Sequence, residues 1–378
     1  MPFEPDPSVP ARELASIRLQ AERLARDAYD RAIETFDGAS QEVTAAFAAA
    51  RWPMLELEPW IFRLDGKPVA AALVMVWSVP ARLCSIAALK RGPVLADEES
   101  PMRAAVYAAA IDHLTAEYAH RRRMMLSVFP RAEIAPPVDA VECLDKRGFR
   151  AGARLPYPNF YFVRIAPCGA SQRRSYAQKW RYHLARSEKQ GLVCEAADMA
   201  QLPRFEALYE AMCSRKRFPD YSAYRTLPDL LRDLPDSMKP RLFFVTKDGE
   251  DIAGAVIFTA GRTAAYLYGA TVEKALPLRA GYFMQDRVVS WLRANCRARW
   301  YDLGGTDGFH GLHQFKKGMV GADGLISPTP PVANYASRRR AKLLGLVVYS
   351  VRNTAQTLRG VIHNALSGRA RPDQDREP

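Results

Sequence analysis

Apolar runs in the first half of the chain alternate with short polar turns. The sharpest signal is Asp65-Gly66 between two apolar segments, an arrangement typical of a β-hairpin. A third strand, a helix, a strand, a short helix and a further strand follow, which gives the order β-β-β-α-β-α-β. The predicted strands are 60–64, 69–79, 83–89, 124–129 and 160–165, and the predicted helices are 101–119 and 138–147.

The second half repeats this order. Asp248-Gly249 supplies the turn that Asp65-Gly66 supplies earlier, and a helix over 280–296 places Met284, Val288 and Leu292 on one face. Because the two halves match in order, we expect a structural duplication. The predicted helices are 171–190, 201–213, 226–234 and 280–296, and the predicted strands are 242–246, 252–259, 264–269 and 300–303.

The N-terminal segment differs from both halves. Residues 1–10 are rich in proline, and residues 11–37 carry apolar residues such as Leu14, Ile17 and Leu24 in a polar sequence. We interpret 11–37 as a polar helix that ends at Gly38.

The order of elements limits the fold class to α+β. A hairpin, a third strand, a helix, a strand and another helix is the order of the GNAT acyltransferase fold. An unrelated pair of α+β domains is the alternative.

Composition bounds the class of protein without choosing a function. The chain has 378 residues, of which 48% are hydrophobic and 25% charged, as in ordinary globular proteins. These values exclude a fibrous or wholly disordered chain, and the length suggests two domains or one large one. A net charge of +13 predicts an anionic partner, which is nucleic acid, a phosphate-bearing substrate or a membrane surface.

Most of the positive charge lies in two segments. Residues 171–190 carry a net charge of +5, and residues 338–378 carry +6. The first segment is either a solvated helix face or a face for an anionic ligand. The second segment contains an amphipathic stretch. This stretch either lies on an anionic membrane leaflet or packs against the second half of the chain.

The cysteines and the N-terminal residues indicate where in the cell the protein is expected. The six cysteines occur singly, without a C-x-x-C pair, which is typical of a reducing compartment. The first residues carry acid and proline in place of the basic and apolar residues of a signal peptide. The longest apolar run, 69–79, is too short for a transmembrane helix. We expect a cytoplasmic protein, with peripheral contact at the inner membrane face as a further option and the oligomeric state left open.

Four stretches carry a family resemblance. They are ALKRGPVLADEE (88–99), KWRYHLARSEKQGL (179–192), FEALYEAMCSRKRF (205–218) and YDLGGTDGFHGLHQFKKGMVG (301–321). Together they resemble the FemABX group of peptidoglycan interpeptide-bridge aminoacyltransferases and its relatives with a BioF2-like acyltransferase domain. The most specific stretch is the last, in which a strand ends in Asp-Leu-Gly-Gly and Phe-Lys follows after a short loop.

The resemblance covers about residues 50–335 and implies two tandem GNAT-like lobes around a cleft. FemA-type members that act with tRNA carry a long coiled coil in the second lobe, and 171–191 is too short for one, so this chain resembles the compact members. The predicted divisions are an N-terminal tail and helix (1–45), lobe 1 (46–168), a catalytic lobe 2 (169–335) and a basic C-terminal tail (336–378).

Acyl transfer to an amine requires positive charge or amide N–H groups where an oxyanion develops. Lys316 matches the lysine of the family's Phe-Lys motif, and the resemblance implies that it stabilises the tetrahedral intermediate or the leaving group. The alternative is a solvated surface lysine, the usual fate of this residue type. Phe315 would pack and aim the lysine, and Lys317 would be its exposed neighbour.

Other candidates surround this motif. Gly304 and Gly305 permit close approach of the backbone to a ligand, or they form a plain tight turn. Asp302 is expected to order that turn. Asp307 and His310 are the polar candidates for proton transfer, although substrate phosphate could serve instead of a protein base.

Three further residues are candidates for substrate binding. Arg91, in the Arg-Gly-Pro turn, and Arg215, which resembles the family's arginine at that helix end, could contact phosphates of the acceptor. Both could equally be structural or surface arginines. Tyr268, at the end of a predicted strand, lines the cleft or belongs to the core.

Two enzymatic interpretations follow, and the donor distinguishes them. The first is aminoacyl transfer from aminoacyl-tRNA to an amine of a peptidoglycan precursor or a related cell-envelope acceptor, nucleotide- or lipid-linked. The second is acyl-CoA-dependent N-acylation in exopolysaccharide or small-molecule biosynthesis. The pyrophosphate loop of acyl-CoA GNAT enzymes, Q/R-x-x-G-x-G/A, has no strict match, and the nearest segment, 277–281, lacks its spacing.

The third interpretation is a non-catalytic nucleic-acid-binding protein, which the sequence favours least. It contains no RRM, KH, helix-turn-helix or zinc-finger signature. We expect no cofactor and no metal, because the donor is a co-substrate and the sequence has no H-E-x-x-H or comparable cluster.

Overall fold

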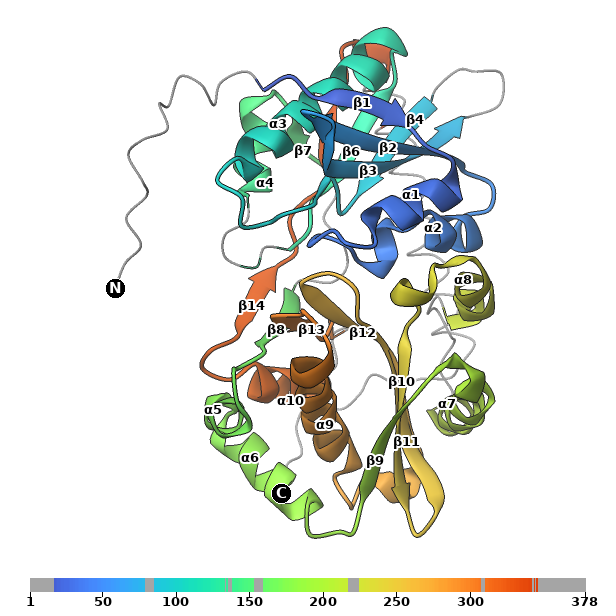
Figure 1. Ribbon diagram of the computed structural model, residues 1–378, viewed down its shortest axis with the longest axis vertical. Helices are drawn as coiled ribbons and strands as arrows, with labels where there is room; N and C mark the ends of the chain where they lie inside the picture. The colour runs from blue at the N-terminus through green and yellow to red at the C-terminus, as the bar shows by residue number, and fades with distance from the viewer. Residues whose placement is uncertain are drawn as a thin grey trace.

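Two β-sheets, each with helices on both faces, form the structure (Figure 1). Figure 1 places the first sheet in the upper half of the molecule and the second in the lower half. The computed structural model describes residues 17–78, 85–132, 134, 138–152, 159–216, 224–306, 310–341, 343 and 345.

The first sheet has eight strands. These are β1 (Gln20–Arg23), β2 (Glu56–Leu64), β3 (Lys67–Ser78), β4 (Ser85–Lys90), β5 (Val94–Leu95), β6 (Met125–Phe129), β7 (Arg150–Ala151) and β15 (Ala333–Tyr335). Their order is β1-β2-β3-β4-β6-β15-β7, and β5 pairs with β3. Asp65 and Gly66 have positive φ angles of 51° and 77°, as a type I′ turn requires, and the predicted hairpin is confirmed.

The second sheet has seven strands in the order β14-β8-β13-β12-β11-β10-β9. The members are β8 (Asn159–Arg164), β9 (Val193–Ala197), β10 (Arg241–Lys247), β11 (Glu250–Phe258), β12 (Thr263–Thr271), β13 (Trp300–Asp302) and β14 (Leu325–Pro328). Asp248 and Gly249 again have positive φ, at the turn between β10 and β11.

Ten α-helices and several short helical turns connect the described strands. The α-helices are α1 (Arg26–Ile33), α2 (Ala45–Arg51), α3 (Arg103–Leu114), α4 (Ala140–Lys146), α5 (Gly169–Ser175), α6 (Gln178–Ser187), α7 (Leu202–Lys216), α8 (Leu227–Asp233), α9 (Ala280–Asn295) and α10 (His310–Val320). The short turns are η2 (Gln41–Val43), η4 (Thr115–Arg121), η5 (Met199–Gln201), η6 (Tyr224–Thr226), η7 (Asp236–Met238) and η8 (Glu273–Ala275). No helix in the described part of the chain is long and apolar enough to cross a membrane.

Each sheet contains the same crossover unit, which confirms the predicted duplication of element order. In the first, α3 carries the chain from β4 to β6, and these two strands are parallel. In the second, α9 carries it from β12 to β13, which are also parallel. A parallel pair needs such a crossover, whereas the hairpins that precede it are antiparallel.

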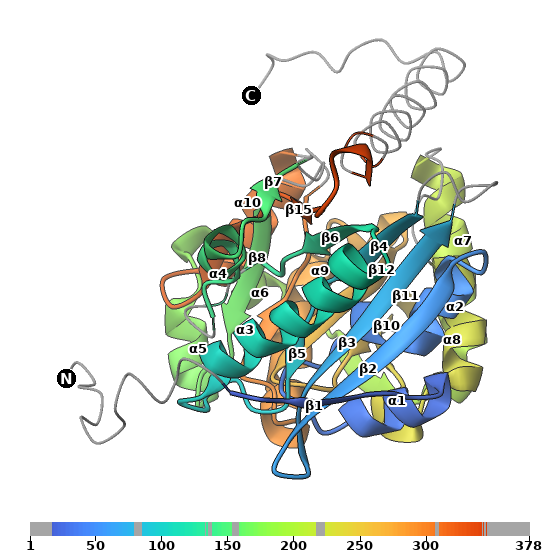
Figure 2. The ribbon, with the colours of Figure 1, turned by 90° about the horizontal axis from the view of Figure 1, so that it is seen from above.

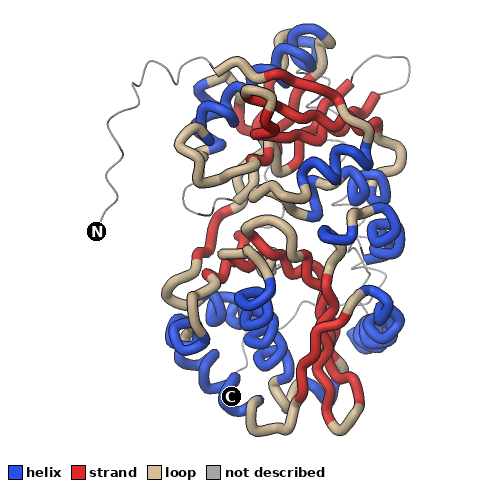
Figure 3. Tube along the Cα trace, in the orientation of Figure 1, coloured by secondary structure: helices blue, strands red, loops and turns tan. Residues whose placement is uncertain are grey.

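A shared core lies between the two sheets. Successive strand residues point to opposite faces, so Ile61 of β2 and Val256 of β11 enter this core, whereas Phe62 and Ile257 enter the outer cores. Helices α1, α2, α7 and α8 complete the shared core. Helix α3 covers the outer face of the first sheet (Figure 2), and α6, α9 and α10 cover that of the second. The tube in Figure 3 shows these layers of helix and strand.

The two sheets exchange one strand each. β8 pairs with β13 and β14 in the second sheet, and β15 returns to the first sheet between β6 and β7. The Ser127 hydroxyl on β6 donates a 2.7 Å hydrogen bond to the Asn334 side chain on β15. The chain therefore crosses between the sheets twice, once before β8 and once after β14.

This exchange corrects the predicted strand order of the first half. The strand predicted at 160–165 exists, but its assignment to the first half is wrong, because it pairs in the second sheet. Local pattern identifies a strand without identifying its partner. The boundary predicted between 168 and 169 stays a prediction.

The predicted helix over 11–37 is wrong in its middle part. Residues 20–23 form the edge strand β1, which pairs with β2 from Gln20↔Arg63 to Arg23↔Trp60, and α1 begins only at Arg26. Ile17, Leu19 and Ala21 alternate, and all three pack against the outer core of the first sheet. Residues 1–16 and 346–378, which hold the proline-rich start and most of the basic tail, lie outside the described residues.

The predicted helix over 171–190 consists of two helices, α5 and α6. Tyr176 has ψ of 146° and Ala177 has ψ of 151°, both extended. The end of α10 docks into this break, where the Ala177 amide donates to the Gly318 carbonyl (2.9 Å) and the Ala322 amide to the Ser175 carbonyl (2.8 Å).

Candidate active site

The turn that follows β13 is ordered by the last residue of the strand. The Asp302 carboxylate accepts a 2.7 Å hydrogen bond from the Gly304 amide, and Gly304 has a φ of 68°. A Cβ at Gly304 would meet no other atom, so the backbone here faces open space. The expectation that Asp302 orders the turn is confirmed.

Lys316 approaches the same turn from α10. The residue is only 6% exposed, and its ammonium donates hydrogen bonds to the carbonyls of Leu303 and Gly305. The alternative of a solvated surface lysine is therefore wrong. A buried ammonium needs such partners, because its desolvation would otherwise cost several kcal/mol. The positive charge is thus held within the second lobe, at the end of β13.

The Phe-Lys motif lies on helix α10. Phe315 packs against Tyr282, with ring centroids 4.8 Å apart, and against Trp180, at 6.1 Å. A Cβ at Gly318 would lie 3.1 Å from the Trp180 ring, so the glycine permits close packing of α6 on α10. These contacts fix α10 and hence Lys316, while Lys317 is exposed as expected.

Arg91 reaches Asp302 from the first lobe. Its backbone has a φ of 55°, directly after β4, and its amide donates to the Phe129 carbonyl (2.8 Å). The guanidinium lies 3.9 Å from the Asp302 carboxylate and 5.1 Å from the centroid of the Phe160 ring. Arg91 thereby joins the first lobe to the turn that Lys316 holds in the second.

Glu42 completes this junction, and the sequence analysis missed it. Its carboxylate lies 2.9 Å from the Arg91 guanidinium and 2.9 Å from the Lys90 ammonium. Lys90 in turn lies 5.0 Å from the centroid of the Trp52 ring. Burial alone would raise the pKa of Glu42, but Arg91 and Lys90 outweigh it and hold that pKa at about 2.

Asp302 has the opposite electrostatic balance. Burial raises the pKa of its carboxyl, and the nearby Arg91 guanidinium, the Gly304 amide and Lys316 offset this only in part. The junction therefore combines an ionised Glu42 with an Asp302 carboxyl whose pKa is higher than that of an ordinary aspartate.

A tyrosine–histidine pair lies behind the turn. The Tyr161 hydroxyl on β8 and His313 Nδ1 on α10 are 2.5 Å apart, and the Tyr161 carbonyl accepts a 2.8 Å bond from the Leu303 amide. His313 precedes Lys316 by three residues, which places both on neighbouring faces of one helix. With a helix predicted over 310–320, this spacing would have singled out His313.

Two predicted substrate-binding residues lie on the α7 side of the second sheet. The Arg215 guanidinium, at the end of α7, is exposed and donates to the Thr271 carbonyl at 3.3 Å. Tyr268 is buried in the shared core, where its ring makes an edge contact with Tyr224 at 5.5 Å. The described contacts do not connect either residue with Lys316.

Of the two predicted proton-transfer candidates, His310 and Asp307, only His310 lies among the described residues. His310 is exposed at the start of α10, with its Nε2 3.4 Å from the Gln314 side chain. Asp307 lies outside the described residues.

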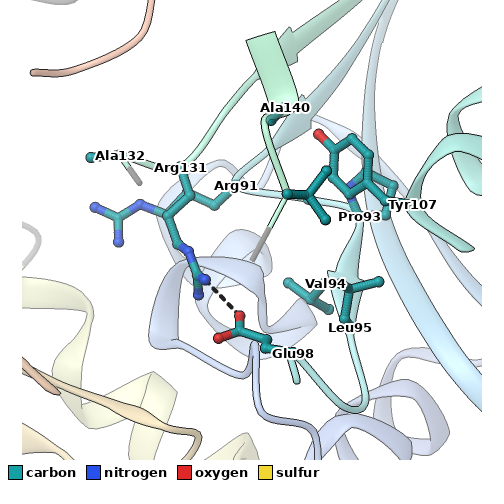
Figure 4. A pocket seen from close by; sticks show the side chains of 11 residues that line it. Arg91, Pro93, Val94, Leu95, Glu98, Tyr107, Arg131, Ala132 and Ala140 are labelled. Atoms are coloured by element: carbon teal, nitrogen blue, oxygen red, sulfur yellow. Dashed lines mark hydrogen bonds and ion pairs between the residues drawn. The ribbon is translucent and has the colours of Figure 1, made fainter. Parts of the chain in front are cut away.

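A small pocket adjoins the Arg91 turn on the first lobe (Figure 4). It is lined by residues around that turn and by Tyr107 and Val138, and the Arg131–Glu98 ion pair (2.5 Å) lies at its edge. Its volume is about 50 Å³. Pockets for small molecules begin at about 300 Å³, so this pocket has room for a small group only.

Comparison with known proteins identifies the fold and one domain. Residues 170–317 match the family model described as an acetyltransferase (GNAT) domain. The chain therefore contains a GNAT acyltransferase domain, which includes α9, β13 and the Phe-Lys motif of α10. No curated protein matches the sequence significantly.

Solved structures match over most of the chain. The crystal structure of FemX matches with a TM-score of 0.68 and 17% identity, over 87% of this chain and 99% of the FemX chain. The C-terminal domain of an Agrobacterium fabrum protein described as a lysylphosphatidylglycerol synthetase matches with a TM-score of 0.53 and 16% identity, over 85% and 96%. L-PGS from Bacillus licheniformis matches with a TM-score of 0.53 and 11% identity, over 86% and 95%. The predicted α+β fold of two GNAT-like lobes is confirmed.

Proposed function

We propose that this chain is an aminoacyltransferase that uses aminoacyl-tRNA as donor and an amine of a peptidoglycan precursor, or of a related cell-envelope molecule, as acceptor. The observation that carries the proposal is the buried Lys316 at the Gly304-Gly305 turn, in a fold that matches FemX. The name of the Agrobacterium fabrum protein also fits an amino acid as the transferred group.

The chemistry is attack of an amine on an ester carbonyl. A C–N bond forms, the carbonyl oxygen becomes an oxyanion, and the C–O bond to the ribose then breaks. The amine loses a proton and the ribose oxygen gains one. Lys316 supplies fixed positive charge for the oxyanion or the leaving oxygen, and a charge that is already oriented stabilises the transition state without reorganisation.

The other predicted residues take supporting roles in this proposal. Arg91 and Arg215 contact phosphates of the acceptor, and Gly304 and Gly305 let it approach the backbone. Phe315 aims Lys316, whereas Tyr268 belongs to the shared core. Asp307 or His310 would accept the proton if substrate phosphate does not. No cofactor is required.

An acyl-CoA-dependent N-acyltransferase is the second candidate. The observation that favours it is the family model itself, which is described as an acetyltransferase domain. The absence of a strict Q/R-x-x-G-x-G/A loop in the sequence speaks against it.

A donor screen with a matched pair of variants tests the proposal. Aminoacyl-tRNAs and acyl-CoAs are offered to the purified protein beside a lipid-linked peptidoglycan precursor. We expect transfer from aminoacyl-tRNA, and we expect Lys316→Met to reduce its rate by about 100-fold or more. Lys317→Met, on the exposed neighbour, is expected to change it less than about twofold.

Two results would overturn the proposal. One is acceptance of acyl-CoA with no transfer from any aminoacyl-tRNA, and the other is full activity of Lys316→Met. Circular dichroism of both variants checks that any loss is not a loss of folding.

A further inference from the structure

Helix α6 presents a basic and aromatic surface beside the candidate active site. Lys179, Tyr182, His183 and Arg186 recur at helical spacing on one side of the helix. Arg279 and Tyr282, at the start of α9, adjoin them, as ring contacts and electrostatics around His183 indicate. We call these six residues the α6 face.

The cations of this face have no carboxylate partner. In the part of the chain that the structure describes, no acidic side chain lies within ion-pair distance of Lys179, Arg186 or Arg279, and all three are exposed. Glu188, the acidic residue next to the end of α6, pairs with Arg173 and lies 3.6 Å from Arg287. The positive charge of the face is therefore available to an anion.

A row of ring contacts connects the face with Phe315 on α10. Ring centroids are 5.4 Å apart between Tyr182 and His183, 4.9 Å between His183 and Tyr282, and 4.8 Å between Tyr282 and Phe315. Phe315 directly precedes Lys316. The row begins at Tyr182, which is 57% exposed, and ends at the Phe315 ring on α10, the helix that also carries Lys316.

His183 is the neutral member of the row. Burial and the positive charges of Arg279, Lys179 and Arg186 lower the pKa of its imidazole. Its Nδ1 is buried without a hydrogen-bond partner among the described residues. The ring is therefore uncharged at neutral pH, and the positive charge of the face comes from the lysine and the arginines.

We propose that the α6 face binds single-stranded RNA, which in the proposed function is the 3′ end of the aminoacyl-tRNA donor. Proteins bind single strands by combining cations for the phosphates with aromatic side chains on which bases stack. The face combines both, and its rings lead toward the residue at which the 3′-terminal ester would react. An anionic membrane is the competing partner, but it does not account for a row of rings that leads to α10, the helix that carries Lys316.

RNA binding is measured on the full chain with a fluorescent RNA hairpin that ends in a single-stranded CCA, and with the same hairpin without that end. The charge reversal Lys179→Glu/Arg186→Glu is compared with Arg26→Glu/Lys67→Glu, which makes the same change of net charge on exposed, unpaired cations of the first lobe. We expect the first pair to weaken binding about tenfold or more and to lower the salt dependence by about two counterions, and the control to change binding less than about twofold. Tyr182→Ala is expected to weaken binding of the CCA-ended hairpin about fivefold and of the blunt hairpin hardly at all.

The outcomes separate this proposal from the proposed function. Equal binding by both double variants, no RNA binding by the wild type, or preference for phosphatidylglycerol vesicles over RNA would overturn the α6 face as an RNA site. If the wild type transfers from aminoacyl-tRNA and the α6 variant does so at full rate, the face is wrong while the function stands. If RNA binding depends on the face but no aminoacyl-tRNA is used, the face stands while the function is wrong.

Discussion

A single buried carboxylate holds the start of α2. Asp30, on α1, is 2% exposed and accepts hydrogen bonds from the amides of Ala45 (2.7 Å) and Ala46 (2.9 Å). These are among the first amides of α2, which have no partner within their own helix. Burial raises the pKa of Asp30 to about 6, although the two amide bonds work in the opposite direction.

This pKa predicts how stability depends on pH. Between about pH 4 and pH 6 the folded chain keeps a proton on Asp30 that the unfolded chain releases, so the free energy of unfolding falls as pH rises through this window. The full effect is on the order of 3 kcal/mol. We expect Asp30→Asn, measured by urea unfolding at several pH values, to reduce this downward slope.

The control is Asp27→Asn on the exposed side of the same helix, where Asp27 pairs with Arg31 at 2.5 Å. The pKa of Asp27 is lowered by this pairing, so its replacement is expected to leave the downward slope in place. Parallel pH profiles of the wild type and Asp30→Asn would contradict the assignment.

At the scale of elements, the position of α10 depends on how the helix ends. Gly321 follows its last residue with a φ of 62°, and a Cβ there would overlap the Ser175 carbonyl in the break between α5 and α6. Gly304 has a similar φ of 68° but faces open space. The two glycines therefore differ in packing and not in backbone conformation.

Alanine substitutions are expected to reflect that difference. Gly304→Ala adds only the strain of a left-handed residue, and we expect it to lower the free energy of unfolding by about 1 kcal/mol. Gly321→Ala adds an overlap with backbone, and we expect a loss of about 3 kcal/mol or more. Denaturant unfolding of both variants measures this, and equal losses would show that α10 does not dock as described.

The elements that the sequence predicted best are those specified locally. Asp65-Gly66 and Asp248-Gly249 predicted both hairpins because type I′ turns need residues that tolerate positive φ. Strands β5, β7, β9, β14 and β15 were not predicted. They have two to five residues, and the shortest, β5, β7 and β15, depend on partners far along the chain. The edge strand β1 was mistaken for helix because its four residues are mostly exposed.

The residues of the site also divide into those that stand in sequence motifs and those that only folding brings together. Lys316, Gly304 and Arg91 stand in motifs and were found by resemblance to a family. Glu42 stands in no motif, and only folding brings it to Arg91, so no pattern in the sequence pointed to it. The burial of Lys316 also follows from tertiary packing, since a lysine is exposed in most contexts.

At the scale of the whole molecule, two sets of charges connect the lobes. Asp37, four residues after the end of α1, interacts with Arg262 and Arg297 of the second lobe, and the Arg262 amide donates to the Asp37 carbonyl at 2.9 Å. The second set is the junction of Glu42, Arg91 and Asp302 at the candidate active site. Together they fix the first lobe against the turn that Lys316 holds.

Arg91→Met tests the second set. The variant keeps the length of the side chain but leaves Glu42 and Asp302 without the guanidinium, and removing one partner from a buried ion pair costs about 3 kcal/mol. We expect a loss of about that size in urea unfolding, with a larger loss at pH 7 than at pH 4, where protonation relieves Asp302. Arg31→Met, in the exposed pair with Asp27, is expected to cost less than about 0.5 kcal/mol. A loss as small as that for Arg91→Met would mean that the junction is not a stabilising contact.

The strand exchange restricts where the chain can be divided without removing a strand from a sheet. β8 precedes the boundary predicted between residues 168 and 169 but pairs in the second sheet, and β15 follows that boundary but pairs in the first sheet. If the chain were divided between residues 168 and 169, the first part would contain β8 without its sheet, and its own sheet would lack β15. The second part would contain β15 without its sheet, and its own sheet would lack β8. Each sheet is therefore complete only when residues from both sides of that boundary are present in one chain.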